Sequence, residues 1–184
     1  MAHFAECRVD NNEVIRVIVV SDQDVTNNGG NNSTESEQWV KDNTPQGVRL
    51  KEHYESQGLS YPDTYWKQTY KYGPERGVYA GPSCLWNSTH NIFTDKQPYS
   101  SWVLNTTSGL HEAPVAAPSA DIQNYRLTDD LDDNGDRIGI FDFYPPEWNE
   151  SLTTWICKKN PLSENKMRRW EASSSSFLSE EDIV

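Results

Sequence analysis

Alternation of apolar and polar residues, which is typical of short β-strands, dominates the hydrophobic pattern of the chain. Residues 3–9 and 14–20 are β-rich runs, and an Asp/Asn turn at residues 10–13 separates them. This arrangement predicts an N-terminal β-hairpin. Residues 22–33 are rich in Asn, Asp and Gly, and we expect them to form a loop.

A helical pattern is expected in one region, residues 34–58. Ser33 or Thr34 can cap its start, and Glu37 stands three residues after Thr34, where a capping-box partner is expected. Pro45 should divide the region into two short helices, because proline breaks the helical hydrogen-bond pattern.

From residue 65 onward, short strands that carry a Trp or Phe alternate with Asn/Ser/Thr turns and prolines. Asn134-Gly135 is the strongest of the hairpin signals. Hairpins of this size are unstable alone in water, so each must pack on a neighbour or on another protein. Besides a strand at 65–70, the expected hairpins are 84–86 with 91–94, 101–104 with 110–113, 124–127 with 137–143, 148–156, and 168–170 with 176–178.

These patterns predict a mainly β fold with a short helical insertion, built from an N-terminal β-hairpin or small sheet and serial β-hairpin modules. We expect an N-terminal α+β domain at residues 1–118. We expect extended hairpin modules and a tail at residues 119–184. The Ser-rich stretch 173–176 and the acidic stretch 180–182 have compositions typical of disorder.

The composition indicates a thin hydrophobic core. Of the 184 residues 35% are hydrophobic, below the ~45–50% of an average globular domain. Aromatic residues nevertheless make up 11% of the chain, which is too many for a typical disordered protein. A few large rings on small sheets can therefore supply much of the buried area.

The charge balance excludes some classes of partner. There are 28 acidic and 16 basic residues, a formal net charge of −12, which repels nucleic acid and anionic membrane surfaces. No apolar run approaches the ~20 residues of a membrane span, and we expect no secretory signal. The three cysteines are far apart and form no CxxC pair, so we expect unpaired thiols.

One segment offers candidate metal ligands. Asp130, Asp132, Asn134 and Asp136 place oxygen donors at alternate positions, as in the first half of a calcium loop. The glutamate of a standard loop is replaced by Phe141, and no helical pattern flanks the segment. The alternatives are a non-helical calcium site and a plain hairpin turn with solvated acids, of which we favour the turn. No other cofactor is expected.

No catalytic residue is expected, and the chain is interpreted as non-enzymatic. Its 28 carboxylates are so numerous that a pair of them is no indication of a hydrolase. The four histidines lack metal-ligand spacing, and nothing resembles a nucleophile elbow or a phosphate-binding glycine loop.

The seven tryptophans divide into two expected groups. Four are assigned to the core: Trp39, Trp66, Trp86 and Trp102. Three lie in the C-terminal modules and are candidate partner-binding residues: Trp148, Trp155 and Trp170. Buried Trp side chains commonly dominate the binding energy of protein interfaces. The alternative is that the tryptophans form a platform that stacks on sugars.

Three blocks in order along residues 1–118 carry a resemblance to a known family. They are Met-Ala-His-Phe-Ala-Glu at 1–6, Trp-Lys-Gln-Thr at 66–69 with Tyr-Ala-Gly at 79–81, and Pro-Tyr-Ser-Ser-Trp at 98–102 with Glu-Ala-Pro-Val at 112–115. The chain thereby resembles small virion-associated structural proteins of marine cyanophages and related marine phages. The resemblance implies a structural role in the virion.

We therefore expect a non-enzymatic bacteriophage virion protein, most simply a decoration or cement protein on the outside of the capsid. Its partners would be the major capsid protein or other virion proteins in a multi-copy assembly, with neither nucleic acid nor membrane. It would be made in the host cytoplasm and reside in the virion. The alternative is a tail-fibre or receptor-binding module that recognises host surface glycan.

Overall fold

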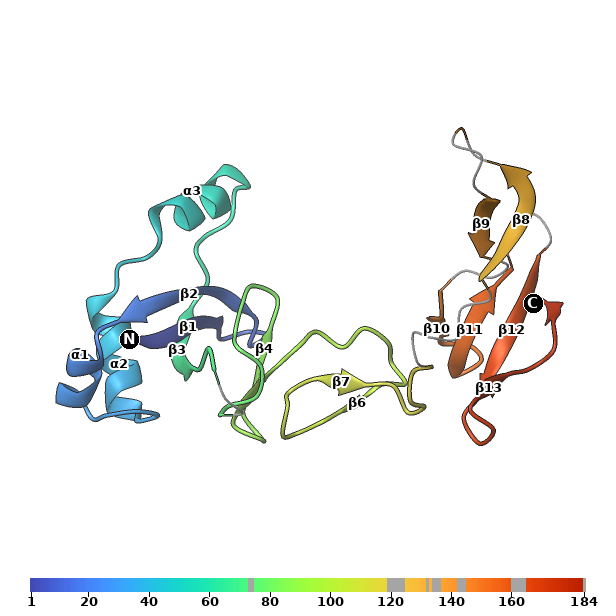
Figure 1. Cartoon of the computed structure of the whole chain (residues 1–184). Coiled ribbons are helices and arrows are strands. Elements are labelled where there is room, and N and C mark those ends of the chain that lie inside the picture. Colours follow the sequence, from blue (N-terminus) through green and yellow to red (C-terminus); the bar gives the residue numbers. More distant parts are fainter. Residues whose placement is uncertain are drawn as a thin grey trace. The chain divides into compact units, whose positions relative to one another are not determined.

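The computed structural model describes residues 1–72, 75–118, 125–131, 133, 137–141, 145–159 and 165–183. These residues form antiparallel sheets and short helices, which confirms the mainly β fold with a helical insertion (Figure 1). The chain divides into two compact units. Unit 1 comprises Met1–Pro98 and Leu104–Glu112, and unit 2 comprises Tyr99–Val103 and Ala113–Val184. The domain boundary expected after residue 118 stays a prediction, because a division by contacts does not test independent folding.

A three-stranded antiparallel sheet of order β2-β1-β3 forms the centre of unit 1. Its strands are β1 (Ala2–Arg8), β2 (Val14–Val20) and β3 (Thr64–Thr69). The predicted N-terminal hairpin is thus confirmed. The turn that joins β1 to β2 contains Asn12, which has a φ of 63°. Asparagine tolerates this left-handed conformation better than most residues.

The two helices predicted within residues 34–58 are confirmed as α2 (Thr34–Asn43) and α3 (Val48–Ser56). The predicted Ser33 cap is confirmed, whereas the capping box of Thr34 with Glu37 is wrong. Ser33 caps α2 by accepting a hydrogen bond from the backbone N–H of Ser36. The Glu37 carboxylate instead binds basic side chains outside the helix.

The loop expected at residues 22–33 is also partly wrong, because α1 (Asp22–Asn27) forms there. Ser21 Oγ accepts a hydrogen bond from the backbone N–H of Gln23 and caps this short helix. Asp22 and Asp24 lie in its first turn, where carboxylates interact favourably with the helix dipole.

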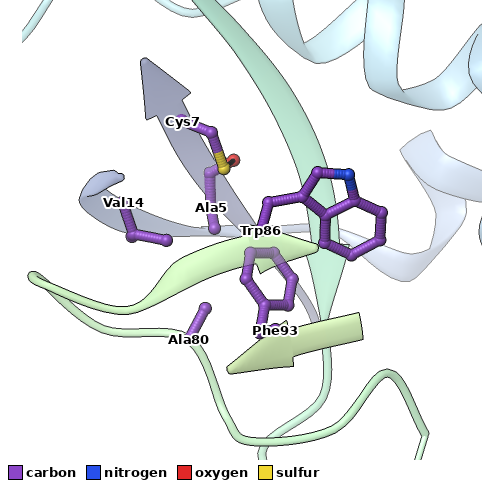
Figure 2. Close-up of a cluster of buried hydrophobic side chains, with 6 residues drawn as sticks. All are labelled: Ala5, Cys7, Val14, Ala80, Trp86 and Phe93. Carbon is purple, nitrogen blue, oxygen red and sulfur yellow. Dashed lines mark hydrogen bonds between the residues drawn. The ribbon is translucent and has the colours of Figure 1, made fainter. Parts of the chain in front are cut away.

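The two faces of the sheet carry separate hydrophobic clusters, because successive strand residues point to opposite faces. One cluster joins the sheet to α1 and α2 and contains Ala2, Phe4, Val25, Val40 and Trp66. The other is covered by the β4–β5 hairpin and contains Ala5, Cys7, Val14, Ala80, Trp86 and Phe93 (Figure 2). Trp66 and Trp86 are therefore core residues, as predicted, and Trp39 is half-buried against the first cluster.

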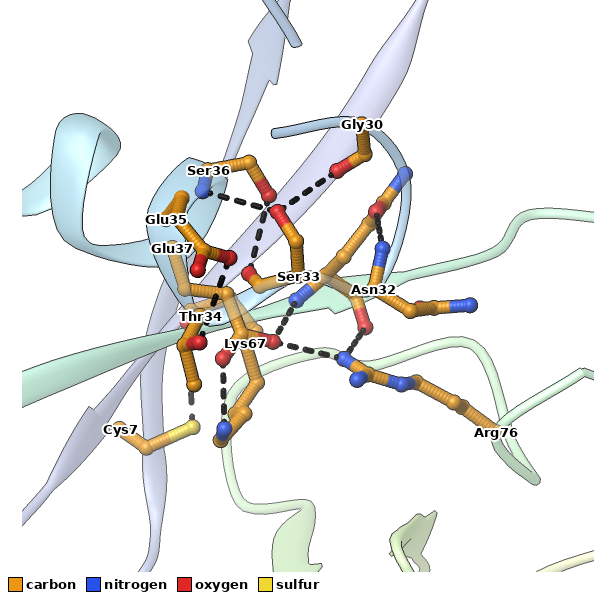
Figure 3. A network of polar contacts seen from close by, with 12 residues as sticks. Cys7, Gly30, Asn32, Ser33, Thr34, Glu35, Ser36, Glu37, Lys67 and Arg76 are labelled. Carbon is orange, nitrogen blue, oxygen red and sulfur yellow. Dashed lines mark hydrogen bonds and ion pairs between the residues drawn. The ribbon is translucent and has the colours of Figure 1, made fainter. Parts of the chain in front are cut away.

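A buried ion-pair network closes the outer edge of β3 (Figure 3). Glu37 accepts from Lys67 Nζ at 2.6 Å and from Arg76 Nη1 at 2.9 Å. Arg76 also donates to the backbone oxygen of Gln68, whose N–H lies 3.5 Å from Glu37 Oε1. Side chains thus supply partners for backbone groups that an edge strand would otherwise expose.

The short hairpins predicted between residues 84 and 113 are confirmed, with shorter strands. They are β4 (Leu85–Asn87) with β5 (Ile92–Thr94), and β6 (Val103–Leu104) with β7 (His111–Glu112).

In unit 2 the C-terminal hairpins share strands and form one antiparallel sheet of order β10-β11-β12-β13, with β14 also paired to β12. The strands are β10 (Glu147–Asn149), β11 (Thr154–Lys158), β12 (Lys166–Glu171), β13 (Ser176–Phe177) and β14 (Glu181–Asp182). A separate hairpin pairs β8 (Tyr125–Leu131) with β9 (Arg137–Phe141).

The acidic stretch 180–182 contains strand β14, although its composition is typical of disorder. Asp182 pairs with Lys166 across the strands, with 2.7 Å between the charged groups, and Glu181 forms an ion pair with Arg169. These basic residues of β12 supply the countercharges that local composition does not reveal.

Candidate functional site

The candidate site is a cluster of four aromatic rings in unit 2. Trp148 on β10 and Trp155 on β11 are cross-strand partners whose ring centroids lie 5.5 Å apart. Trp102 lies 6.1 Å from the first ring and 6.2 Å from the second, and Tyr99 lies 5.5 Å from Trp102. We refer to Tyr99, Trp102, Trp148 and Trp155 as the ring cluster. Two of the three predicted partner-binding tryptophans thus come together in it.

The third predicted partner-binding residue, Trp170, lies on β12 and is not among these rings. It packs edge-to-face on Phe177, with 5.2 Å between the ring centroids. Trp170 is buried, and its cross-strand partner is that same phenylalanine. Its place in the sheet of unit 2 is sufficient to account for this burial.

Glu150 fastens the segment 99–103 to the β10–β11 turn. Its carboxylate accepts hydrogen bonds from Ser100 Oγ, from the N–H of Ser101 at 2.8 Å and from Ser101 Oγ at 2.7 Å. Trp148 Nε1 also donates to it, at 2.9 Å. The hydrogen bonds from Ser100, Ser101 and Trp148 lower the pKa of Glu150 to about 2. The carboxylate is therefore ionised and fully engaged, which makes it a structural group rather than an acid or base.

The exposed fraction of each side chain decides which parts of this site a partner can touch. Trp148 is 6% exposed and lies beneath the surface, while Trp155 is half-buried and donates from Nε1 to the backbone oxygen of Val115. Tyr99 is 37% exposed and Val103 is 64% exposed. The segment that Glu150 fastens therefore presents the exposed side chains of Tyr99 and Val103, and the Tyr99 ring lies 6.5 Å from the buried ring of Trp148.

Tyr99, Trp102 and Glu150 were not predicted as site residues from the sequence. Trp102 was assigned to the core, but it is half-buried and stands in the ring cluster. The available signal was the Pro-Tyr-Ser-Ser-Trp block at 98–102, which places two rings and two hydroxyls within five residues. Nothing in its spacing indicates a glutamate about fifty residues later as the partner.

The predicted calcium loop lies mostly outside the described residues. Asp130 belongs to β8, while Asp132, Asn134 and Asp136 fall outside the described ranges. Within the described ranges, no group of three or more His, Cys, Asp or Glu side chains is arranged to hold a metal ion. The calcium site therefore stays a prediction.

The cysteines are free, as predicted: Cys7, Cys84 and Cys157. Burial raises the pKa of Cys7 to about 12 and that of Cys157 to about 11. These two thiols are protonated at neutral pH, which makes them poor nucleophiles and poor metal ligands.

Within the described residues, no helix has the length and apolar character needed to cross a membrane.

Comparison with known proteins adds no relative, since no protein-family model, no curated protein and no solved structure matches the chain. The residues and geometry of the ring cluster are therefore the basis for a functional proposal.

Proposed function

We propose that the chain is a non-enzymatic bacteriophage virion protein that decorates the outer surface of the particle and docks through the ring cluster. The three-block resemblance supports the virion role. The net charge of −12 favours an outer face away from packaged DNA. The direct partner would be the major capsid protein or another virion protein present in many copies.

The observation that carries this proposal is that two independently identified features, the block at 98–102 and the pair Trp148 and Trp155, lie together in the ring cluster. The Pro-Tyr-Ser-Ser-Trp block at 98–102 belongs to the resemblance, and Trp148 and Trp155 are candidate anchors on other grounds. Through Glu150 the block is joined to the strands that carry those anchors. A surface used for docking would account for both features.

The physical basis for docking is preorganisation. Interface energy concentrates in a few aromatic residues that are surrounded by groups which exclude water. Here Glu150 already fixes the segment that carries Tyr99 and Val103, so a partner would lose less conformational entropy on ordering it. Trp148 and Trp155 would act from beneath, by holding this surface in shape.

The test is co-sedimentation of the purified chain with particles of the phage that encodes it. Tyr99→Ala should weaken binding by about tenfold or more, because truncation of an interface aromatic commonly costs at least ~1–2 kcal/mol. Tyr72→Ala is the matched control, since Tyr72 is 79% exposed and lies in unit 1. This variant should bind as the unaltered chain does. Equal binding by Tyr99→Ala would exclude docking through the ring cluster.

The position in the particle needs a second measurement. Purified particles must contain the chain, and immunogold label should lie on the heads. Absence of the chain from purified particles would contradict the virion role. Label on the tails would instead favour the receptor-binding alternative.

A further inference from the structure

Unit 1 contains a groove of about 360 Å³ that the docking proposal does not use. It lies where the β1–β2 turn, the β4–β5 hairpin and the β6–β7 hairpin meet, and we refer to it as the polar groove. Its lining includes Asn11, Asn12, Asn87, Ser88, Thr89 and His111. None of its lining residues is Asp, Glu, Lys or Arg, in a chain whose residues are 24% charged.

In two asparagines of the polar groove, Asn12 and Asn87, the side-chain oxygen is already hydrogen-bonded within the protein. Asn12 Oδ1 accepts from the hydroxyl of Tyr65 at 2.8 Å. Asn87 Oδ1 accepts from the backbone N–H of His90 at 3.1 Å and thereby fixes the hairpin turn. Each carboxamide is oriented by its oxygen, so the Nδ2 amino groups are the donors left for a ligand.

An aspartate behind the polar groove sets the hydrogen-bonding role of His111. Asp95 Oδ1 lies 2.5 Å from His111 Nδ1 and also accepts from the His111 backbone N–H at 2.9 Å. Because a carboxylate accepts hydrogen bonds, Nδ1 carries the proton. Nε2 is then the ring nitrogen left for a ligand, because it has no hydrogen-bond partner among the described residues.

The lining therefore combines amide donors, an imidazole nitrogen and hydroxyls with the apolar side chains of Leu85 and Leu104. A sugar presents the same combination, with hydroxyl groups around an apolar face of C–H bonds. A charged ligand would lose hydration in this groove, and no Asp, Glu, Lys or Arg side chain lines it to offset that loss. Trp86 is only 5% exposed, so ring stacking contributes little and hydrogen bonds must provide the selectivity.

We infer that the polar groove is a binding site for a neutral saccharide. This site lies within unit 1 and does not depend on docking through the ring cluster. Affinity should be modest, with a dissociation constant on the order of 0.1–1 mM, because the groove is small and offers no stacking platform.

The test is an NMR titration of the full ¹⁵N-labelled chain with neutral hexasaccharides of glucose, mannose and N-acetylglucosamine, and with hexagalacturonate as the acidic probe. At least one neutral probe should shift the side-chain amide signals of Asn12 and Asn87, and hexagalacturonate should not. No shift from any neutral probe at ~10 mM, or binding of the acidic probe alone, would overturn the inference.

Asn87→Asp is the informative variant, because it keeps the oxygen that accepts from His90 and replaces the donor by a carboxylate. It should weaken binding about tenfold or more. The matched control is Asn149→Asp in unit 2, whose Oδ1 likewise accepts from a backbone N–H, that of Leu152. An equal loss in both variants would place the binding elsewhere. Thr89→Lys, at the exposed tip of the same hairpin, is a second variant for the case in which Asn87→Asp perturbs the hairpin. It should also weaken binding.

Discussion

Glu37 and Glu150 each accept hydrogen bonds from several donors, but their surroundings give them different roles. Glu37 is 6% exposed and is paired with Lys67 and Arg76, of which the arginine is itself almost fully buried. Glu150 stands among neutral donors in a turn of unit 2. Loss of the first carboxylate leaves the buried guanidinium of Arg76 and the half-buried ammonium of Lys67 without a countercharge, whereas loss of the second releases a loop.

Replacing Glu37 should strongly destabilise unit 1. Glu37→Gln should lower the free energy of unfolding by about 3–5 kcal/mol, the usual cost of removing one partner of a buried ion pair. Urea unfolding followed by tryptophan fluorescence measures this change. Glu35→Gln, an exposed residue of the same helix, should change it by less than about 0.5 kcal/mol. A similar small effect for both variants would show that the ion pairs are dispensable.

Glu150 should make the stability of unit 2 sensitive to acid. Its pKa is about 2 in the folded chain and 4.5 in the reference state, so the folded state favours the ionised form. The resulting stabilisation is complete above about pH 4.5 and is lost as the pH falls through about 2. Melting curves across this range should show a smaller acid-induced decrease in Tm for Glu150→Gln than for the unaltered chain. Identical pH profiles would contradict this role, and Glu52→Gln on exposed helix α3 is the control.

At the scale of elements, local patterns predicted most of the strands. The β1–β2 hairpin and the pairs β4–β5 and β12–β13 follow from alternation and turn residues that lie close together in the sequence. The short helix α1 was missed because its Asn-rich and Gly-rich end resembles a loop. Ser21 followed by two aspartates was the available start signal.

The ring cluster could not be predicted in the same way. Trp148 and Trp155 are close in sequence, but Tyr99 and Trp102 join them through contacts across about fifty residues. Such long-range contacts depend on the packing of the whole unit, and neither alternation nor turn signals contain that information. Glu37 illustrates the same limit, because its partner Arg76 is far from helix α2 in the sequence.

The segment predicted as a plain turn or a calcium loop, residues 130–136, begins in β8 and ends just before β9. We expect a chelator such as EDTA to leave the melting temperature unchanged, because Phe141 replaces the usual glutamate ligand and is a residue of β9. Thermal melting with calcium and then with chelator provides the measurement. A melting temperature that rises with calcium and falls with chelator would establish a bound ion through its linkage to folding.

At the scale of the whole molecule, both described hydrophobic clusters of unit 1 lie within residues 2–93. A shortened chain of residues 1–118 should therefore stay folded, with a cooperative melting transition and the far-UV dichroism of strands and short helices. A non-cooperative transition would show that unit 1 needs the C-terminal residues.

The proposed docking through the ring cluster predicts that the same shortened chain binds particles far more weakly than the full chain, because it lacks Glu150, Trp148 and Trp155. Co-sedimentation of both chains at matched concentrations measures the difference. Equal binding would move the docking surface to unit 1, where the edge strand β2 carries Val19 with 55% of its surface exposed.

The division of the chain into units has a consequence for how such a protein can evolve. The chain passes from unit 1 to unit 2 after Pro98, returns at Leu104 and leaves again after Glu112. Genes exchange domains most readily where one boundary separates two folding units. Here a single recombination point between residues 98 and 113 would divide the two segments of unit 1, or would separate Tyr99–Val103 from Glu150, which holds that segment in place. We expect recombination to transmit the two units together, as one inherited block.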